Sequence, residues 1–424
     1  VRSVVISGSE FVALQLDVED AHHLLYTKPK DQGLQSFAWH GAEHGTAGYY
    51  HWKANAQGMR HTPYYWERLG AAMLRCLILL ITCGGRPACW AFRYVDDFLV
   101  LFRKDATFVL SARIVLFFLI VGVPLSWKKM YIGFRPVWLG YQLDLTSRRI
   151  SWQPHKVADV KARLLELVQG KINSKQIERC GGKCCWLAAA AEHLKPFCRP
   201  FFTSRSLGNG RVMSWASLPT GVKHDVLFWL EALNSFAGYV PLEARSPFPG
   251  SMASDAFACG ELAGIGGWWS DSPQPQDASE VWWFSEQMNA RDLDWIFHTD
   301  ELQTIIASLE LLGSIVLLKL FGSRAQSCEL DLWVRLCTDS QVASHVQSRW
   351  YSPTDPLNSV LKELALTVLR LDAALQLYHV SGAQNIWADL LSRGDLRGFD
   401  AQKRLRVDVC DSQWWILTPR EFHK

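Results

Sequence analysis

The sequence lacks a strong excess of charge of either sign. Its 44 Lys and Arg residues nearly balance its 41 Asp and Glu residues, so the formal net charge is +3. Such a balance gives no compositional sign of a nucleic-acid-binding protein. With 49% hydrophobic and 20% charged residues, the chain is not of the disordered class. Its 424 residues predict two or three domains with substantial cores.

Long apolar runs are missing too. The longest, CLILLITC and IVLFFLIVGVPL, are shorter than the roughly 20 residues that span a bilayer, so we expect them to be buried helices or strands. This predicts no contact with a membrane. No signal peptide is recognisable, and the first residue is Val1 rather than Met. We therefore expect an intracellular protein of the cytoplasm or nucleus that is not secreted, and a chain numbered as a fragment.

The eleven cysteines show no metal-binding pattern. The cluster RCGGKCCW holds Cys180, Cys184 and Cys185, but no second Cys or His pair follows at the spacing of a zinc finger. Reduced cysteines of an intracellular protein are the expectation. Internal repeats and low-complexity tracts are absent as well.

Apolar periodicity predicts an alternation of strands and helices. In FVALQLDV (11–18), apolar residues alternate with Gln15 and Asp17, as in a strand with one polar face. The segment YVPLEARSPFPGS (239–251), rich in Pro, Ser and Gly, predicts a domain boundary. We expect helices near 63–82, 105–121, 156–194 and 301–321, and strands near 88–102, 137–145, 148–154, 251–260, 264–270, 281–286, 332–340 and 375–382.

The stretch FRYVDDFLVLF (92–102) places Asp96 and Asp97 between two apolar arms, where an unpaired carboxylate is costly. It predicts a β-hairpin with the acids at its turn. A single Asp there is usually a turn cap or an ion-pair partner, but two adjacent carboxylates repel each other unless a cation lies between them. Antiparallel pairing with the strand at 11–18 would bring Asp17 beside Asp96. The three acids thus predict a site for two Mg²⁺ ions roughly 4 Å apart, suited to phosphoryl transfer.

Five motifs follow one another between Leu14 and Leu143: LQLDVEDAHH, ANAQGMRHTPYYWERL, YVDD, GVPLSWKKM and WLGYQL. Their order resembles the motif series of reverse transcriptases, and it is most similar to the versions in long-terminal-repeat and tyrosine-recombinase retrotransposons. The resemblance implies an RNA-directed DNA polymerase palm, an antiparallel sheet with helices. Such an enzyme works with an RNA template, a DNA primer and dNTPs.

The resemblance also implies roles for single residues. Three acids would be catalytic and bind the metal ions: Asp17, Asp96 and Asp97. Gln57 and Gly58 would contact the template or the incoming nucleotide, since glycine permits close backbone approach. Lys128 or Lys129 would assist the departing pyrophosphate, although a solvated surface pair explains these lysines equally well.

Two features depart from the family. The position five residues after the first Asp, where the family carries an aromatic residue that screens out ribonucleotides, is His22. Only sixteen residues precede Asp17, so the fingers subdomain, whose basic residues grip the triphosphate, is missing upstream. We therefore expect an altered sugar screen at His22 and an incomplete polymerase in this chain.

A second set of acids lies in the C-terminal part: Asp255 (ASDAF), Glu310 (IIASLELL), Asp339 (LCTDS) and Asp389 (NIWADLLSR). The order strand–strand–strand–helix–strand–helix–strand–helix, with acids at these places, resembles ribonuclease H. The tail HVSGAQNIWADLLSR is similar to that of retrotransposon members. The resemblance implies a mixed-sheet α/β domain whose four carboxylates are catalytic. They would hold two Mg²⁺ or Mn²⁺ ions that cleave the RNA strand of an RNA–DNA hybrid.

Three points stay open at this second site. Asp339 also suits a helix cap, and Glu301 is a less favoured alternative to Glu310. Cellular members carry a His in the loop before the last acid, but none lies between Gly382 and Asp389. The weak substitute is His379. We therefore expect altered product release or metal exchange.

The resemblance covers most of the chain and implies a multidomain protein of the α+β and α/β classes. The expected parts are an N-terminally truncated palm (1–150), a helical thumb and connection (151–240), a ribonuclease H-like domain (251–400) and an unassigned tail (401–424). The implied function is that of a retrotransposon reverse transcriptase and ribonuclease H, with two metal ions in each active site. Two alternatives stay open: a decayed or domesticated copy that binds nucleic acid without chemistry, and a nuclease whose palm is only a platform.

Overall fold

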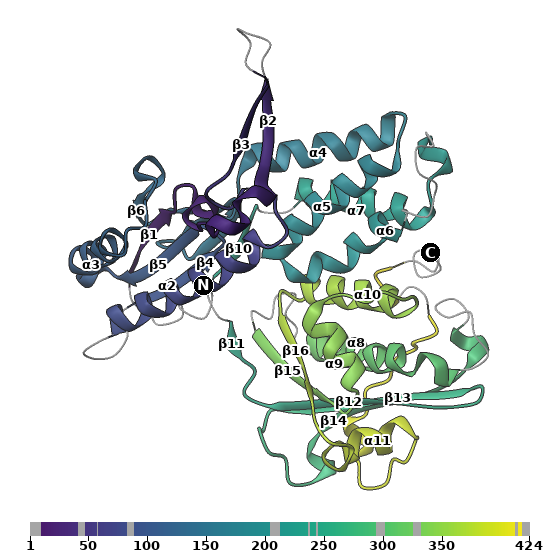
Figure 1. The fold of residues 1–424 in the computed structure, drawn as a ribbon. Coiled ribbons are helices and arrows are strands. Elements are labelled where there is room, and N and C mark those ends of the chain that lie inside the picture. The colour runs from purple at the N-terminus through teal and green to yellow at the C-terminus, as the bar shows by residue number, and fades with distance from the viewer. Residues whose placement is uncertain are drawn as a thin grey trace. The chain divides into compact units, whose positions relative to one another are not determined.

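The computed structural model of this chain describes residues 10–40, 47–56, 58–82, 89–203, 213–235, 238–242, 245–293, 302–324, 332–411 and 414–417. These residues form a mixed α/β protein with antiparallel and mixed sheets (Figure 1). The chain divides into two compact units, one made of Val1–Gln153 and Tyr239–Glu243, the other of Pro154–Gly238 and Ala244–Lys424. The helices of the expected thumb and connection therefore belong to the same unit as the C-terminal sheet.

The N-terminal unit is built on an antiparallel sheet with the strand order β4–β5–β1–β6. Its strands are β1 (Phe11–Asp17), β4 (Cys89–Tyr94), β5 (Asp97–Arg103) and β6 (Tyr131–Gly133), and its helices are α2 (Thr62–Thr82) and α3 (Thr107–Ile120). A second antiparallel sheet consists of β7 (Val137–Trp138), β8 (Tyr141–Asp144), β9 (Arg149–Trp152) and β10 (Tyr239–Pro241). A separate hairpin of β2 (Ser36–His40) and β3 (Ala47–His51) is not predicted by the sequence.

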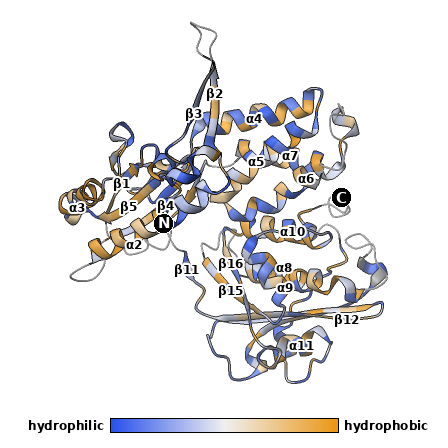
Figure 2. Ribbon diagram, in the orientation of Figure 1, coloured by the Kyte–Doolittle hydropathy of each residue, from blue (hydrophilic) through white to orange (hydrophobic). Residues whose placement is uncertain are grey.

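Alternation along β1 divides its apolar side chains between two cores, whereas the sequence predicts one apolar and one polar face. Val12, Leu14 and Leu16 pack in one buried cluster with residues of α2 and α3. Phe11 and Ala13 belong to the other, which includes residues of β5 and β8. Figure 2 shows hydrophobic residues along α2 and α3. Because both faces of β1 are buried, a shift of one residue would exchange the two sets, and the register is strongly fixed.

The second unit begins with helices. They are α4 (Pro154–Gln169), α5 (Ser174–Ala190), α6 (Arg199–Thr203) and α7 (Thr220–Ser235). A capping box starts α5, in which Asn173 and Gln176 each bond the other's backbone N–H. Asp225 of α7 is buried and accepts a 2.5 Å hydrogen bond from Lys362 of α10 (Leu357–Arg370). Burial raises the pKa of Asp225 to about 7, and Lys362 offsets part of that rise.

The C-terminal sheet of this unit is mixed. Antiparallel β12 (Ser251–Cys259), β13 (Leu262–Ser270) and β14 (Trp282–Asn289) are followed by β15 (Leu332–Thr338), which runs parallel to β11 (Ser246–Pro247), β12 and β16 (Ala374–His379). The remaining helices are α8 (Ile306–Arg324), α9 (Gln341–Arg349) and α11 (Ile386–Ser392). The sequence predicts one helix between β15 and β16, and the structure has two, α9 and α10. The sequence does not predict β11 either.

Helices α8 and α11 cover opposite faces of this sheet (Figure 1). Gly313 of α8 lies near the side chain of Ile265, whereas α11 meets the neighbouring residue of β13, Gly266. Successive residues of a strand point to opposite faces. The segment Leu302–Arg324 is long and apolar enough to cross a membrane, but 78% of its apolar window is buried inside the fold. It is therefore placed as the core helix of the domain.

The tail that the sequence leaves unassigned lies along the C-terminal unit in its described part. The backbone N–H of Leu405 donates to the carbonyl of Trp283 at 2.8 Å. Further on, the N–H groups of Ile416 and Leu417 donate to the buried carboxylate of Glu363. These bonds make the tail part of the fold.

Candidate functional site

Three acids of the C-terminal unit come together: Asp255, Glu310 and Asp339. One carboxylate oxygen of each lies within 4.8 Å of the others. Ala253 of β12 pairs with Cys337 of β15 in parallel, so Asp255 and Asp339, each two residues further on, lie side by side on the same face. Glu310 joins them from α8, where it accepts a 3.4 Å hydrogen bond from the Thr338 hydroxyl. The predicted convergence of these three acids is confirmed.

Two glycines of β13 let α11 approach this group. Gly266 is the ladder partner of Asp255, and a Cβ on it would lie 2.4 Å from the backbone nitrogen of Ser392. A Cβ on Gly264 would lie 2.0 Å from the Ser392 carbonyl oxygen. Glycine is required where another backbone comes so close. As a result the Ser392 hydroxyl donates to Oδ2 of Asp255 at 2.8 Å.

Hydrogen bonds fix α11 at both ends. Asn385, just before the helix, donates from Nδ2 to the carbonyl of Ser254 at 3.2 Å. At the other end, Gln287 of β14 donates from Nε2 to the Ser392 carbonyl at 2.8 Å. The helix that carries Asp389 is therefore held in place by polar contacts from two strands, one buried and one partly buried.

The three acids interact as like charges in a buried place. Asp255 and Glu310 are only 5% and 6% exposed. Burial, together with Asp339, raises the pKa of Asp255 to about 7. Burial, followed by the charges of Asp255 and Asp339, raises the pKa of Glu310 well above its usual range. Within the described residues none of the three forms an ion pair, so a divalent cation would relieve their repulsion.

The fourth predicted acid, Asp389, lies beside this group and outside its tightest part. It is half-buried and ion-pairs with Arg393 one turn later, with 2.7 Å between Oδ1 and Nε. Its charge contributes to the raised pKa of Asp255. The alternative acid Glu301 lies outside the described residues. His379 is exposed at the end of β16.

In the N-terminal unit, Asp17 ends β1 and Asp97 begins β5, and the two are direct ladder partners. The register thus places Asp97, rather than Asp96, opposite Asp17, because Val95 and Asp96 form the two-residue turn between β4 and β5. Val95 has φ 53°, as hairpin turns of this length require. Asp96 stays adjacent, since its carbonyl accepts a 3.1 Å bond from Val18 N–H.

Lys129 contacts this acid group. Its Nζ lies 2.7 Å from Oδ2 of Asp17, whose side chain is 8% exposed. Burial, then the charges of Asp96 and Asp17, raise the pKa of Asp97, and Lys129 opposes that rise. Both lysines singled out in the sequence are exposed, and of the two only Lys129 is ion-paired among the described residues.

The other predicted substrate contacts fall in different settings. His22 lies in the 3-10 turn Ala21–Leu24, and its buried Nε2 has no hydrogen-bond partner in the described part of the chain. Gly58 is exposed with φ +88°, a left-handed conformation that favours glycine. Gln57 lies outside the described residues.

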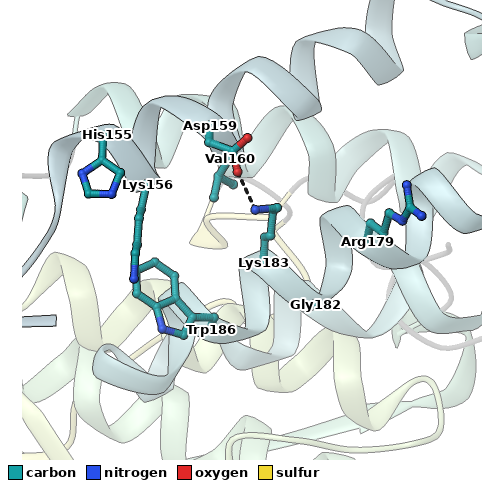
Figure 3. Close-up of a pocket in the computed structure, with 8 residues that line it drawn as sticks. All are labelled: His155, Lys156, Asp159, Val160, Arg179, Gly182, Lys183 and Trp186. Carbon is teal, nitrogen blue, oxygen red and sulfur yellow. Dashed lines mark hydrogen bonds and ion pairs between the residues drawn. The ribbon is translucent and has the colours of Figure 1, made fainter. Parts of the chain in front are cut away.

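A separate groove lies between α4 and α5 in the second unit (Figure 3). Its volume is about 590 Å³, and its lining residues are His155, Lys156, Asp159, Val160, Arg179, Gly182, Lys183 and Trp186. Lys183 ion-pairs with Asp159, and Lys156 Nζ lies 5.1 Å from the ring centre of Trp186. Three cationic side chains against one acid make the groove electropositive.

Sequence reasoning missed the residues that orient the acids. Ser392 and Arg393 are the last two residues of the motif NIWADLLSR, where their spacing of three and four residues from Asp389 puts them on the same helix face. Gly266 lies in the glycine-rich stretch GIGGWWS, a signal for close backbone approach. The contact of Lys129 with Asp17 has no local signal.

Comparison with known proteins adds no identification: no protein-family model matches the chain, and no curated protein matches it.

Proposed function

We propose that the C-terminal unit cleaves the RNA strand of RNA–DNA hybrids, and that the chain is of the retrotransposon reverse transcriptase and ribonuclease H type. The observation that carries this proposal is the buried group of Asp255, Glu310 and Asp339, which has no ion-pair partner among the described residues. An all-oxygen donor set of this kind suits Mg²⁺ or Mn²⁺.

The ions would be held by Asp255, Glu310, Asp339 and Asp389. Two bound divalent ions supply an activated water and charge stabilisation at the leaving oxygen of the RNA strand. The chain's own contribution is orientation. The Ser392 hydroxyl fixes Asp255 at 2.8 Å, and the α11 contacts hold Asp389 at the edge of the group. Such outer contacts hold metal ligands in a productive geometry.

The α4–α5 groove supports a nucleic-acid substrate for this unit. Lys156, Arg179 and Lys183 present positive charge along it. Phosphate contacts of this type dominate the affinity for nucleic acids and do not depend on base sequence. We propose that this groove contacts the backbone of the hybrid.

A second function, nucleotidyl transfer at the N-terminal acids, is favoured by the pairing of Asp17 with Asp97 and the adjacent turn residue Asp96. This site would use an RNA template, a DNA primer, dNTPs and two Mg²⁺ ions. Primer extension by the purified chain tests it. Extension that Asp96→Asn abolishes would support the polymerase. Absence of extension is expected both from the incomplete polymerase and from the nuclease-only alternative.

The deciding experiment is cleavage of an end-labelled RNA–DNA hybrid by the purified 424-residue chain in Mg²⁺ or Mn²⁺. Asp339→Asn removes a ligand charge and preserves shape. It should lower cleavage at least about a hundredfold, since even outer-shell partners of metal ligands contribute 10–100-fold. Hybrid binding, measured by fluorescence anisotropy, should persist.

The matched control is Asp277→Asn, which changes an exposed acid of the same unit and should leave cleavage unchanged. Cleavage that survives Asp339→Asn would show that the chemistry lies elsewhere. Binding without any cleavage by the wild-type chain would favour the domesticated, binding-only alternative.

A further inference from the structure

Lys129 is placed at Asp17 by the backbone around it. The segment before it runs beside the end of β1, where Ser126 N–H donates to the Asp17 carbonyl at 2.9 Å. Two residues after Lys129, β6 begins and pairs with β1 through Tyr131 and Gln15. The short turn Trp127–Lys129 is therefore fixed on both sides. The backbone of Lys129 is thus held beside Asp17, while its side chain is 67% exposed.

The ammonium occupies an oxygen that a metal ion would need. Lys129 Nζ lies 2.7 Å from Oδ2 of Asp17, and this carboxylate is 8% exposed, so it has few other routes to neutralisation. A divalent ion at the same carboxylate would repel the ammonium beside it. The two cations therefore compete for Asp17.

We infer that Lys129 is a resident cation of the N-terminal acid group, which a divalent ion must displace from Asp17 in order to bind. The inference rests on the proposed metal site at Asp17, Asp96 and Asp97, and it adds a control on metal entry. The two acid groups also differ in geometry. Among the described residues, only the C-terminal acids, which form no ion pair, show three carboxylates within 4.8 Å of one another.

The test counts bound Mn²⁺ by electron paramagnetic resonance in an Asp339→Asn background, which weakens the C-terminal group. Lys129→Gln should tighten Mn²⁺ binding at the N-terminal group by about three- to fivefold, the size typical of an ion pair with one exposed partner. The site is identified by loss of this binding on Asp17→Asn.

The matched control is Lys104→Gln, which also removes one positive charge and one ion pair. Lys104 Nζ lies 2.8 Å from Glu10, just before the other end of β1. That seven-residue strand is roughly 20 Å long, so the control acts far from Asp17. Equal shifts from Lys104→Gln and Lys129→Gln would indicate general electrostatics and overturn the inference.

Lysine labelling tests the same displacement without relying on a variant. In the metal-free chain, acylation of Lys129 should be slower than that of Lys128, and Mn²⁺ should accelerate labelling of Lys129 while leaving Lys104 unchanged. Labelling of Lys129 that ignores saturating Mn²⁺ would overturn the inference.

The failures are distinguishable. Asp17-dependent Mn²⁺ binding of equal strength in the wild type and in Lys129→Gln would refute the competition and leave the proposed metal site standing. Absence of N-terminal Mn²⁺ binding in every variant would refute both. The proposed nuclease is judged separately, by hybrid cleavage in chains that retain Asp339.

Discussion

In the N-terminal unit the buried acid Asp17 lies 2.7 Å from the ammonium of Lys129. In the C-terminal unit Asp255 and Glu310 are buried to a similar degree, yet with Asp339 they form no ion pair among the described residues. Both groups consist of carboxylates gathered at a sheet, although Glu310 of the second group comes from helix α8. They differ in what opposes their charge.

That difference shows two ways in which the charge of a buried carboxylate can be neutralised. A lysine neutralises Asp17 within the chain, at the cost of competing with any metal ion. Asp255 and Glu310 instead hold their protons more tightly, since burial and the repulsion of neighbouring acids raise the pKa of Asp255 to about 7 and that of Glu310 well above its usual range. A group of this second kind could hold a divalent ion. The two groups should therefore respond differently to the loss of one charge.

The largest expected effect comes from Gly266→Ala, which disturbs the C-terminal acids indirectly, through the packing of α11 against β13. The new Cβ would lie 2.4 Å from the backbone of Ser392, so α11 must move and Asp255 loses its hydroxyl partner. We expect a loss of about 2–3 kcal/mol in the free energy of unfolding, as for overpacked cores. Misplacement of Asp389 should lower hybrid cleavage by about a hundredfold.

Gly33→Ala is the control. A Cβ there meets no atom within 4 Å, and the residue lies in the 3-10 helix Pro29–Gln35, which holds none of the residues proposed to bind the hybrid. The substitution should therefore leave cleavage unchanged and stabilise the chain by about 0.4–1 kcal/mol. Urea unfolding and the cleavage assay measure both variants. Full cleavage by Gly266→Ala would show that close contact of α11 is not needed.

Removal of one charge should change the free energy of unfolding in opposite directions at the two groups, in metal-free buffer at about pH 8. Glu310→Gln relieves repulsion among three acids and should stabilise its unit by about 0.5–2 kcal/mol. Asp17→Asn removes the buried carboxylate, 8% exposed, from its ion pair with Lys129, which is 67% exposed, and we expect a loss of up to about 1 kcal/mol. The sign of the change in the free energy of unfolding is what distinguishes the two groups.

Amide hydrogen exchange reports each unit separately, through peptides that contain β1 or β12. Exchange should slow around β12 in Glu310→Gln and accelerate around β1 in Asp17→Asn, and each variant should leave the other unit unchanged. Faster exchange in both would show that repulsion at the C-terminal acids is already relieved without metal.

The sequence predicts those features that depend on local periodicity. The alternation along β1, the hairpin around Asp96 and Asp97, and the three antiparallel strands that begin with β12 all follow from patterns of a few residues. The gathering of Asp255, Glu310 and Asp339 was predicted through the resemblance of their order to ribonuclease H. Each acid alone could equally be a cap or a surface charge.

What the sequence cannot predict depends on contacts between distant segments. Lys129 and Asp17 are 112 positions apart, and their meeting depends on where a short turn is pinned beside β1. The exact partner of Asp17 depends on which two residues form the hairpin turn, a choice that shifts the register by one. The close approach of α11 to Gly266 is likewise a tertiary property, visible in the sequence only as an unexplained glycine.

The smallest expected effect sharpens the comparison most. At the C-terminal group, Arg393 corresponds to Lys129, because it forms an ion pair with one of the four predicted acids. Its Nε lies 2.7 Å from Oδ1 of Asp389. Here, however, both side chains are about half exposed, at 52% and 41%, and lie one turn apart on the same helix. Solvent screens such a pair. Arg393→Gln should therefore tighten Mn²⁺ binding at the C-terminal group by less than about twofold.

The measurement is the same electron paramagnetic resonance titration with Mn²⁺, in an Asp17→Asn background, which weakens the N-terminal group. Arg397→Gln, which removes an exposed partner of Asp395, controls for net charge. If burial of the acid decides how strongly a resident cation competes, the shift from Arg393→Gln must be smaller than that from Lys129→Gln, since Asp17 is far less exposed than Asp389. Shifts of equal size would mean that distance alone sets the competition, and that the two acid groups differ less than their surroundings indicate.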